Sequence, residues 1–237
     1  VELGRKLGFQ DVNFHFERNL TNLEIAVGGL LDMQDRMATL KIGGEYRPGS
    51  NKLALKLDFS DLVLSDIISN WGGEYPKIEV PVEGNVSALI NFSEILAHKD
   101  NLIGGLDSAI EQIVFDIKGD AGEVVFNENK EFNYGIDAFV LNGTVSGDLN
   151  SISIKDADFE VGGQKTRLGL DVSGYKKYFF ERSLEDLKIV FSADIARFGL
   201  DDLSKFWPRY LAEPAWEWCK ENLYGGYAEN GRFDFIF

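Results

Sequence analysis

The sequence predicts a mainly β protein built on a long antiparallel sheet, and three observations support this fold class. Apolar residues recur at every second position along most of the chain, as in strands with one buried face. Turn-forming residues separate these runs at short intervals, which favours antiparallel neighbours. Few segments show the spacing of an amphipathic helix. The 237 residues, 44% of them hydrophobic, are enough to bury a substantial core.

Each expected strand carries apolar side chains on one face and wetter residues on the other. The alternating apolar positions are Val12, Phe14 and Phe16; Leu23, Ile25 and Val27; Leu53, Leu55, Leu57 and Phe59; Ile78, Val80 and Val82; Val86, Ala88, Ile90 and Phe92; Phe132, Tyr134, Ile136 and Ala138; Ile152 and Ile154; Leu168, Leu170 and Val172; and Ile189 and Phe191. Turns are expected at residues 47–51, 142–143, 147–148 and 173–174, and at the glycine pairs that begin at Gly43, Gly72 and Gly162. Connections this short favour an antiparallel meander.

Four segments break the two-residue period and predict short helices. Apolar residues at helical spacing mark residues 64–71, 103–113 and 200–207. Pro214 suits the first turn of a fourth helix, which a glycine pair then ends. We therefore expect a C-terminal helical element within residues 200–225.

A strand followed by a short helix occurs twice. Residues 55–60 and 187–192 share one pattern of apolar and polar residues, and an amphipathic stretch ending in tryptophan follows each of them. This similarity predicts repeated strand–helix units at residues 53–73 and 187–208, in which the helix covers apolar surface of the sheet. Coincidence between two amphipathic segments is the alternative.

The charge of the chain limits its partners. Lys and Arg number 24 against 39 Asp and Glu, so the net charge is −15, which argues against binding to a nucleic acid. No uncharged apolar stretch approaches the roughly 18 to 20 residues of a membrane helix. We therefore expect the chain as given to be soluble, while an apolar interior remains free to hold a ligand.

The sequence indicates a protein that is not an enzyme. His15 and His98 lack neighbours in the sequence suited to metal binding or acid–base catalysis, and Cys219 lies as a small apolar residue on an expected helix. A single cysteine forms no internal disulfide, and we expect no metal and no cofactor. Carboxylates are abundant, so a glycosidase-like pair remains a further alternative, which a deep acidic cleft would support.

The two ends of the chain suggest a piece of a longer protein. The first residue is Val1, and the chain stops within the alternating run 232–237, where every second side chain is aromatic. We therefore expect residues 1–237 to be one β-rich fragment of a larger chain, with targeting or anchoring segments outside it.

The C-terminal region carries a more specific pattern of residues. It comprises Phe206-Trp207-Pro208-Arg209-Tyr210-Leu211-Ala212, Trp216, Glu221-Asn222-Leu223, Gly225-Gly226 and a strand that starts at Gly231. This order resembles bacterial AsmA-like proteins, and it is most similar to their YhdP-type branch. Residues 115–126 and 142–163 look similar to the repeated strands of that family, whereas residues 1–100 share only its general style. Cys219 departs from the pattern.

The resemblance implies a fold and a function. Its relatives are long periplasmic proteins, anchored in the inner membrane, which are implicated in phospholipid transport to the outer membrane and in envelope integrity. For this chain it implies a long, twisted, curved antiparallel sheet forming an apolar groove, with a few short amphipathic helices. Phospholipid acyl chains are the implied ligand, with inner- and outer-membrane proteins as further partners. The implied location is the periplasm, and the anchor lies outside this fragment.

Strand parity then predicts which residues line the groove. The predicted lipid-binding residues are Val12, Phe14, Phe16, Leu53, Leu55, Leu57 and Phe59. The pattern alone favours the interior of a closed β-sandwich, which would bind carbohydrate or a protein partner. The resemblance reverses that preference, and an acyl groove needs no catalytic residue.

Overall fold

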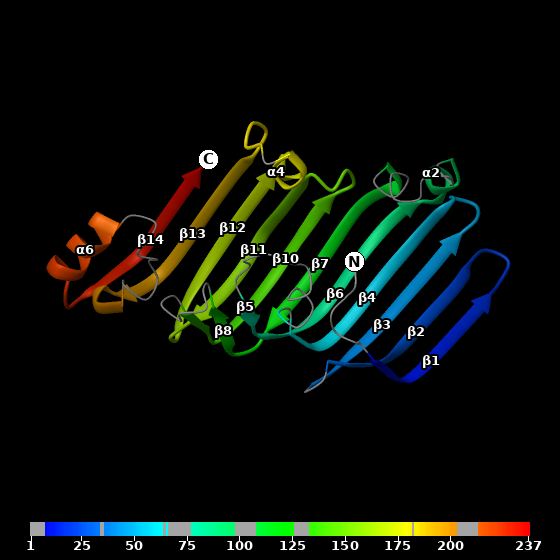
Figure 1. Cartoon of the computed structure of the whole chain (residues 1–237), viewed down its shortest axis with the longest axis horizontal. Helices are drawn as coiled ribbons and strands as arrows, with labels where there is room; N and C mark the ends of the chain where they lie inside the picture. The colour runs from blue at the N-terminus through cyan, green and yellow to red at the C-terminus, as the bar shows by residue number, and fades with distance from the viewer. Residues whose placement is uncertain are drawn as a thin grey trace.

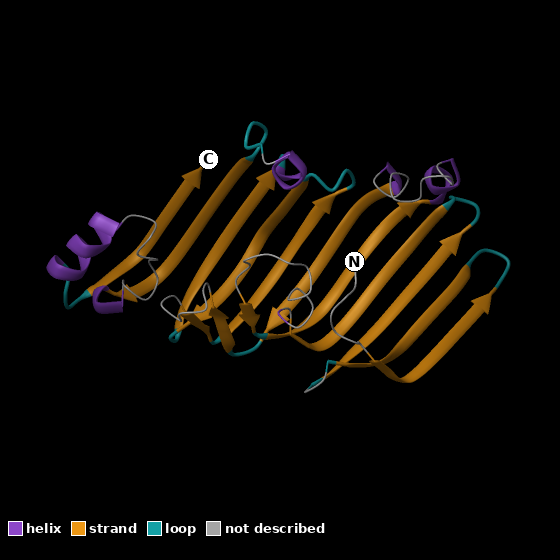
Figure 2. Cartoon of the chain, viewed as in Figure 1, coloured by secondary structure: helices purple, strands orange, loops and turns teal. Residues whose placement is uncertain are grey.

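One open sheet dominates the computed structural model, which describes residues 8–33, 36–63, 65, 77–97, 108–125, 133–181, 183–202 and 213–237. Eleven antiparallel strands form a single twisted layer that runs from β1 at one edge to β14 at the other (Figure 1). Strands account for most of the fold and the helices are few and short (Figure 2). The predicted fold class is thereby confirmed, and the alternative of a closed sandwich is wrong because the sheet stays open.

The order of the strands in space follows their order in the chain, apart from three that form a separate small sheet. The large sheet consists of β1 (Gly8–Arg18), β2 (Leu23–Asp32), β3 (Met37–Arg47), β4 (Lys52–Val63), β6 (Pro81–Asn91), β7 (Ile110–Gly119), β10 (Ala138–Ser146), β11 (Ser151–Val161), β12 (Gln164–Ser173), β13 (Lys188–Gly199) and β14 (Tyr227–Ile236). The small sheet consists of β5 (Lys77–Glu79), β8 (Gly122–Val125) and β9 (Asn133–Ile136). This is the meander that short turns predict.

The helices lie at the margins of the large sheet. Helices α2 (Phe92–Ala97) and α4 (Tyr175–Glu181) lie at one end of the strands, and the small sheet lies at the other end (Figure 1). A 3-10 turn, η1 (Leu200–Asp202), follows β13, and α6 (Glu213–Asn222) precedes β14. The helix predicted around Pro214 is thus confirmed, whereas α2 and α4 have no counterpart in the prediction.

Four β-bulges keep apolar side chains on one face of the large sheet. Asp11 and Asp61 adopt positive φ angles of 51° and 57°, and the strand register shifts at both of them. Two further shifts occur, one within β7 and one within β11. Each shift inserts one extra residue, so that Phe59 and Leu62 point to the same side, where strict alternation would separate them.

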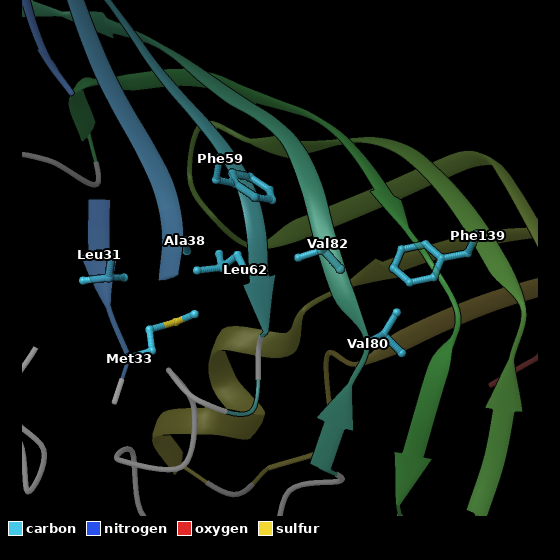
Figure 3. Packing of buried hydrophobic residues seen from close by; sticks show 8 residues of the cluster. All are labelled: Leu31, Met33, Ala38, Phe59, Leu62, Val80, Val82 and Phe139. Atoms are coloured by element: carbon cyan, nitrogen blue, oxygen red, sulfur yellow. The ribbon is translucent and has the colours of Figure 1, made fainter. Parts of the chain in front are cut away.

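The buried core lies at the end of the sheet that adjoins the small sheet. Its members come from β2, β3, β4, β6 and β10, with Met33 just after β2 and Val80 between β5 and β6 (Figure 3). The core cluster consists of Leu31, Met33, Ala38, Phe59, Leu62, Val80, Val82 and Phe139. Ile78 and Ile136 of the small sheet pack against it, so the small sheet covers this part of the large one.

Two predicted turns are wrong, and the helix predicted at residues 103–113 is wrong at its C-terminal end: residues 103–107 lie outside the described residues, residues 108–109 are helical, and residues 110–113 are part of a strand. Gly43 lies inside β3 and Gly143 lies inside β10, where each glycine continues the ladder of hydrogen bonds. Ile110 and Ile113 begin strand β7, where they pair with Ile90 and Ala88 of β6. Pairing between two apolar strands therefore outweighs the helical spacing of these residues.

Other predictions fall wholly or partly outside the described residues. The helix predicted at residues 64–71 has only residue 65 described, and residues 203–212 are not described. The strands of the two predicted strand–helix units are β4 and β13, but the helices that would complete the units fall outside or mostly outside the described ranges. The repeat therefore stays a prediction.

Candidate functional site: an open apolar sheet face

The seven predicted groove residues lie on one face of the large sheet. Phe14 stands opposite Val27, Val27 opposite Ile42, and Ile42 opposite Leu57. Directly opposed residues of antiparallel strands share a face, so Phe14 and Leu57 lie on the same side. Neighbouring rows place Phe16, Leu53, Leu55 and Phe59 there. Val12 lies in the bulge of β1, and its side chain lies 3.5 Å from a β-carbon built on Gly29, which shares the face of Val27. We call this side the apolar face.

The apolar face extends across the whole sheet, beyond the strands on which the sequence placed it. One row of directly opposed residues crosses all eleven strands, and glycine is its only member without an apolar side chain. The row consists of Phe14, Val27, Ile42, Leu57, Val86, Phe115, Gly143, Ile154, Leu170, Phe191 and Phe235. Ten interstrand gaps make this face about 48 Å long from edge to edge.

The opposite side, which we call the polar face, carries charged residues and ion pairs. Lys56 Nζ lies 2.6 Å from Asp58 Oδ1, and Arg167 Nε lies 3.1 Å from Asp158 Oδ1. The hydrogen bond from Arg47 lowers the pKa of Glu45 from its usual value. Glu45 is half-buried and the other side chains are exposed, so the pairs add little stability and mainly keep this face in water.

Exposure of the apolar face varies along the sheet. The side chains of Val12, Phe14 and Phe16 on β1 are exposed, with Phe14 at 66% of its full accessible area. Leu53, Leu55 and Leu57 on β4 are half-buried. Phe59 is buried at 8% within the core cluster, so it is shielded from any ligand that lies on the open part of the face.

Two open patches of large hydrophobic side chains lie on the apolar face, one at each edge of the sheet. The first patch comprises Phe9, Val12, Phe14, Phe16, Ile25, Val27 and Ile42 on β1, β2 and β3. The second comprises Phe233, Phe235 and Phe237 at β14. Contiguous exposed apolar side chains on this scale are typical of binding surfaces.

Packed elements bound the apolar face at both ends of its strands. The core cluster and the small sheet cover one end. At the other end, Phe92 at the start of α2 packs against Tyr46 of β3, with ring centroids 5.1 Å apart. The uncovered part of the apolar face is therefore a band that crosses the strands, between the core cluster at one end and α2 at the other.

Two broad hollows lie over the polar face, which sequence reasoning did not predict. One, of about 620 Å³, lies over β2, β3, β4 and β6, where Ala26, Gly43 and Ala54 leave room between charged neighbours. The other, of about 660 Å³, lies near Asp158, Arg167 and Asp194. The small side chains of Ala26, Gly43 and Ala54 at polar-face positions are the feature of the sequence from which the first hollow could have been predicted.

The described residues show no constellation that points to metal chemistry. Within that part of the chain, no group of three or more His, Cys, Asp or Glu side chains is placed to hold a metal ion. His15 lies 3.7 Å from Glu17, and both side chains are largely exposed on the polar face of β1. Cys219 is half-buried on α6. His98 lies outside the described residues.

None of the helices that the structure describes has the length and apolar character needed to cross a bilayer. No family model matches the chain, and comparisons with curated proteins and with solved structures find no significant match. The fold and the apolar face are therefore the observations on which a function can be argued.

Proposed function

We propose that the apolar face shelters the acyl chains of phospholipids. In this proposal the protein lies in the periplasm, anchored in the inner membrane by a segment outside this chain, and it helps phospholipid reach the outer membrane. The observation that supports this most directly is the exposed first patch on β1, β2 and β3. Its large hydrophobic side chains are exposed to water on paired strands, which is unfavourable unless a ligand covers them.

The energetics of an acyl chain suit such a surface. Each methylene moved from water onto an apolar surface gains about 0.8 kcal/mol, so a chain of many methylenes binds without any polar recognition. An apolar row that crosses every strand offers a nearly uniform surface along the long direction of the sheet. A lipid on it would meet no strongly preferred position, which suits transport better than storage.

Native mass spectrometry of the chain expressed in bacteria, with lipid extraction of the same sample, tests this proposal. We expect phospholipid to co-purify with the protein and to be lost in Phe14→Asp. His15→Asp is the matched control, because His15 is the next residue on the same exposed strand but belongs to the polar face. Circular dichroism confirms that both variants fold.

The outcomes separate the alternatives. Equal lipid content in the two variants would show that the apolar face does not hold the lipid. A folded protein free of lipid would instead favour a protein partner as the occupant of the first patch, since either ligand buries the same side chains.

A further inference from the structure

A second uninterrupted apolar row crosses the sheet beside the row that passes through Val27 and Leu57, which we call the first row. On the inner strands β2 to β10 the second row consists of Ile25, Gly44, Leu55, Ala88, Ile113 and Val145, and further pairings carry it to Ile189 of β13. On each of these strands the two rows lie two residues apart, so they run parallel at about 7 Å. Neither row contains a charged or hydrogen-bonding side chain.

Both rows are accessible to water on the inner strands. In the first row, Val27 exposes 37% and Ile42 exposes 53% of its full accessible area, and Ile25 of the second row exposes 38%. From β4 to β13 the members of both rows are half-buried, except for Gly143, which is buried. A ligand that lies on the apolar face therefore contacts two adjacent rows of apolar side chains.

The next row on each side of these two is closed by packing. On one side Phe59 is buried within the core cluster. On the other side Ile90, which stands opposite Leu53, is 4% exposed and lies two residues before the start of α2. Phe59 and Leu53 are six residues apart on β4, which is about 20 Å, and the side chains of these closed rows reduce the open width to about 13 Å.

The open width limits how an acyl tail can lie. A tail in one leaflet of a bilayer is about 15 Å long, which is half of the hydrocarbon core of about 30 Å. A tail directed along the strands would run onto the core cluster or onto Phe92 at the start of α2, whereas a tail directed across the strands meets apolar side chains over its whole length. Two tails in van der Waals contact need roughly 10 Å of width, so two fit side by side and a third does not.

We propose that the ligand of the apolar face is a lipid with two acyl tails, which lie side by side across the strands on the first and second rows. This inference rests on the proposed function and specifies the number and direction of the tails. The face is about 48 Å long, so about three tails of 15 Å fit end to end along it. One chain then holds about six tails, in about three two-tailed lipids.

Native mass spectrometry of the chain, stripped of lipid and titrated with two defined probes, tests this proposal. The probes are dipalmitoyl phosphatidylcholine and palmitoyl lysophosphatidylcholine, which share one headgroup and one kind of tail. Their zwitterionic headgroup carries no net charge for the −15 of the chain to repel. We expect saturation at about three copies of the two-tailed probe and about six of the single-tailed probe, a ratio of about two.

The saturating numbers also measure the direction of the tails. Tails that lie along the strands would occupy the ten interstrand gaps one by one, and the chain would then hold about ten tails. That number, or equal saturating numbers of the two probes, would overturn the proposal. A folded chain that binds neither probe would instead contradict the proposed function itself.

A pair of adjacent substitutions on β2 provides a matched control. Val27→Asp places a charge in the first row, whereas Ala26→Asp makes the same change of charge at the next residue, which belongs to the polar face. We expect Val27→Asp to lower the saturating number of two-tailed lipids by about one and Ala26→Asp to leave it unchanged, with circular dichroism confirming that both variants fold. An equal effect of the two substitutions would contradict the placement of the tails.

Discussion

Phe139 on β10 lies with its ring against Gly119, the residue directly opposite it on β7. A β-carbon on Gly119 would come within 2.1 Å of Phe139 Cε1, so only glycine leaves space for the ring in this position. The ring also stacks on Phe159 of β11, with centroids 5.5 Å apart. Phe139 thus links three strands at the border of the core cluster.

This contact makes Gly119→Ala destabilising. The added methyl group displaces a buried ring in a packed cluster, and overpacking of this kind costs about 1–3 kcal/mol. Gly43→Ala is the control, because a β-carbon there meets nothing closer than 4.0 Å. Urea unfolding followed by circular dichroism measures both changes in the free energy of unfolding. Similar values for the two variants would mean that Phe139 moves aside freely.

Two phenylalanines of the apolar face should differ sharply in their effect on stability. Phe59→Ala removes a side chain from the core cluster, and we expect it to lower the free energy of unfolding by about 3–5 kcal/mol. Phe14→Ala truncates a side chain that is already exposed on an edge strand, and we expect a change below about 1 kcal/mol. Urea midpoints at constant m-value measure both. Comparable losses would show that Phe14 is also part of the core.

The sequence predicts the strands and their faces well, because alternation along a strand depends on local residues alone. It places Phe14 and Leu57 on one face correctly, although three strand pairings separate them. It cannot predict that Phe59 is covered, since the cover comes from the distant small sheet. Nor does it reveal that Gly143 sits inside a strand, because the ring that needs this glycine belongs to Phe115 on a neighbouring strand.

The turn between β10 and β11 should give the protein a measurable pH dependence. Asp148 accepts hydrogen bonds from the hydroxyl of Ser146 and from the backbone N–H of Asn150, the latter at 3.0 Å. These bonds lower the pKa of Asp148 below its usual value of 3.8. A lowered pKa means that the ionised form stabilises the fold. This contribution is present above the unfolded-state pKa and is lost as the pH falls through the folded-state pKa.

We therefore expect Asp148→Asn to be less stable than the unaltered chain at about pH 6, and the difference to shrink towards about pH 3. Urea unfolding across this range measures it. In a Ser146→Ala background, which removes the main cause of the pKa shift, the same substitution should have a weaker dependence on pH. A difference that grows on acidification would have the wrong sign for this mechanism.

The bulge at Asp61 decides which side chains of β4 reach the core. Its positive φ of 57° inserts one extra residue, so that Phe59 and Leu62 both join the core cluster. Asp tolerates this backbone conformation and glycine adopts it freely, but a β-branched residue does not. Asp61→Gly should therefore leave the stability unchanged or raise it by up to about 1 kcal/mol, whereas Asp61→Val should lower it by about 1–2 kcal/mol.

Valine favours regular strands, so the Asp61→Val variant also sets strand propensity against the bulge. If the bulge is required to bury Leu62, Asp61→Val both lowers the free energy of unfolding and removes Leu62 from the core. A further Leu62→Ala substitution then lowers the free energy of unfolding less in that variant than in the unaltered chain. The two single variants and the double variant form a thermodynamic cycle that measures this coupling. Full additivity would mean that Leu62 stays buried without the bulge, and that the apolar face does not depend on the backbone at Asp61.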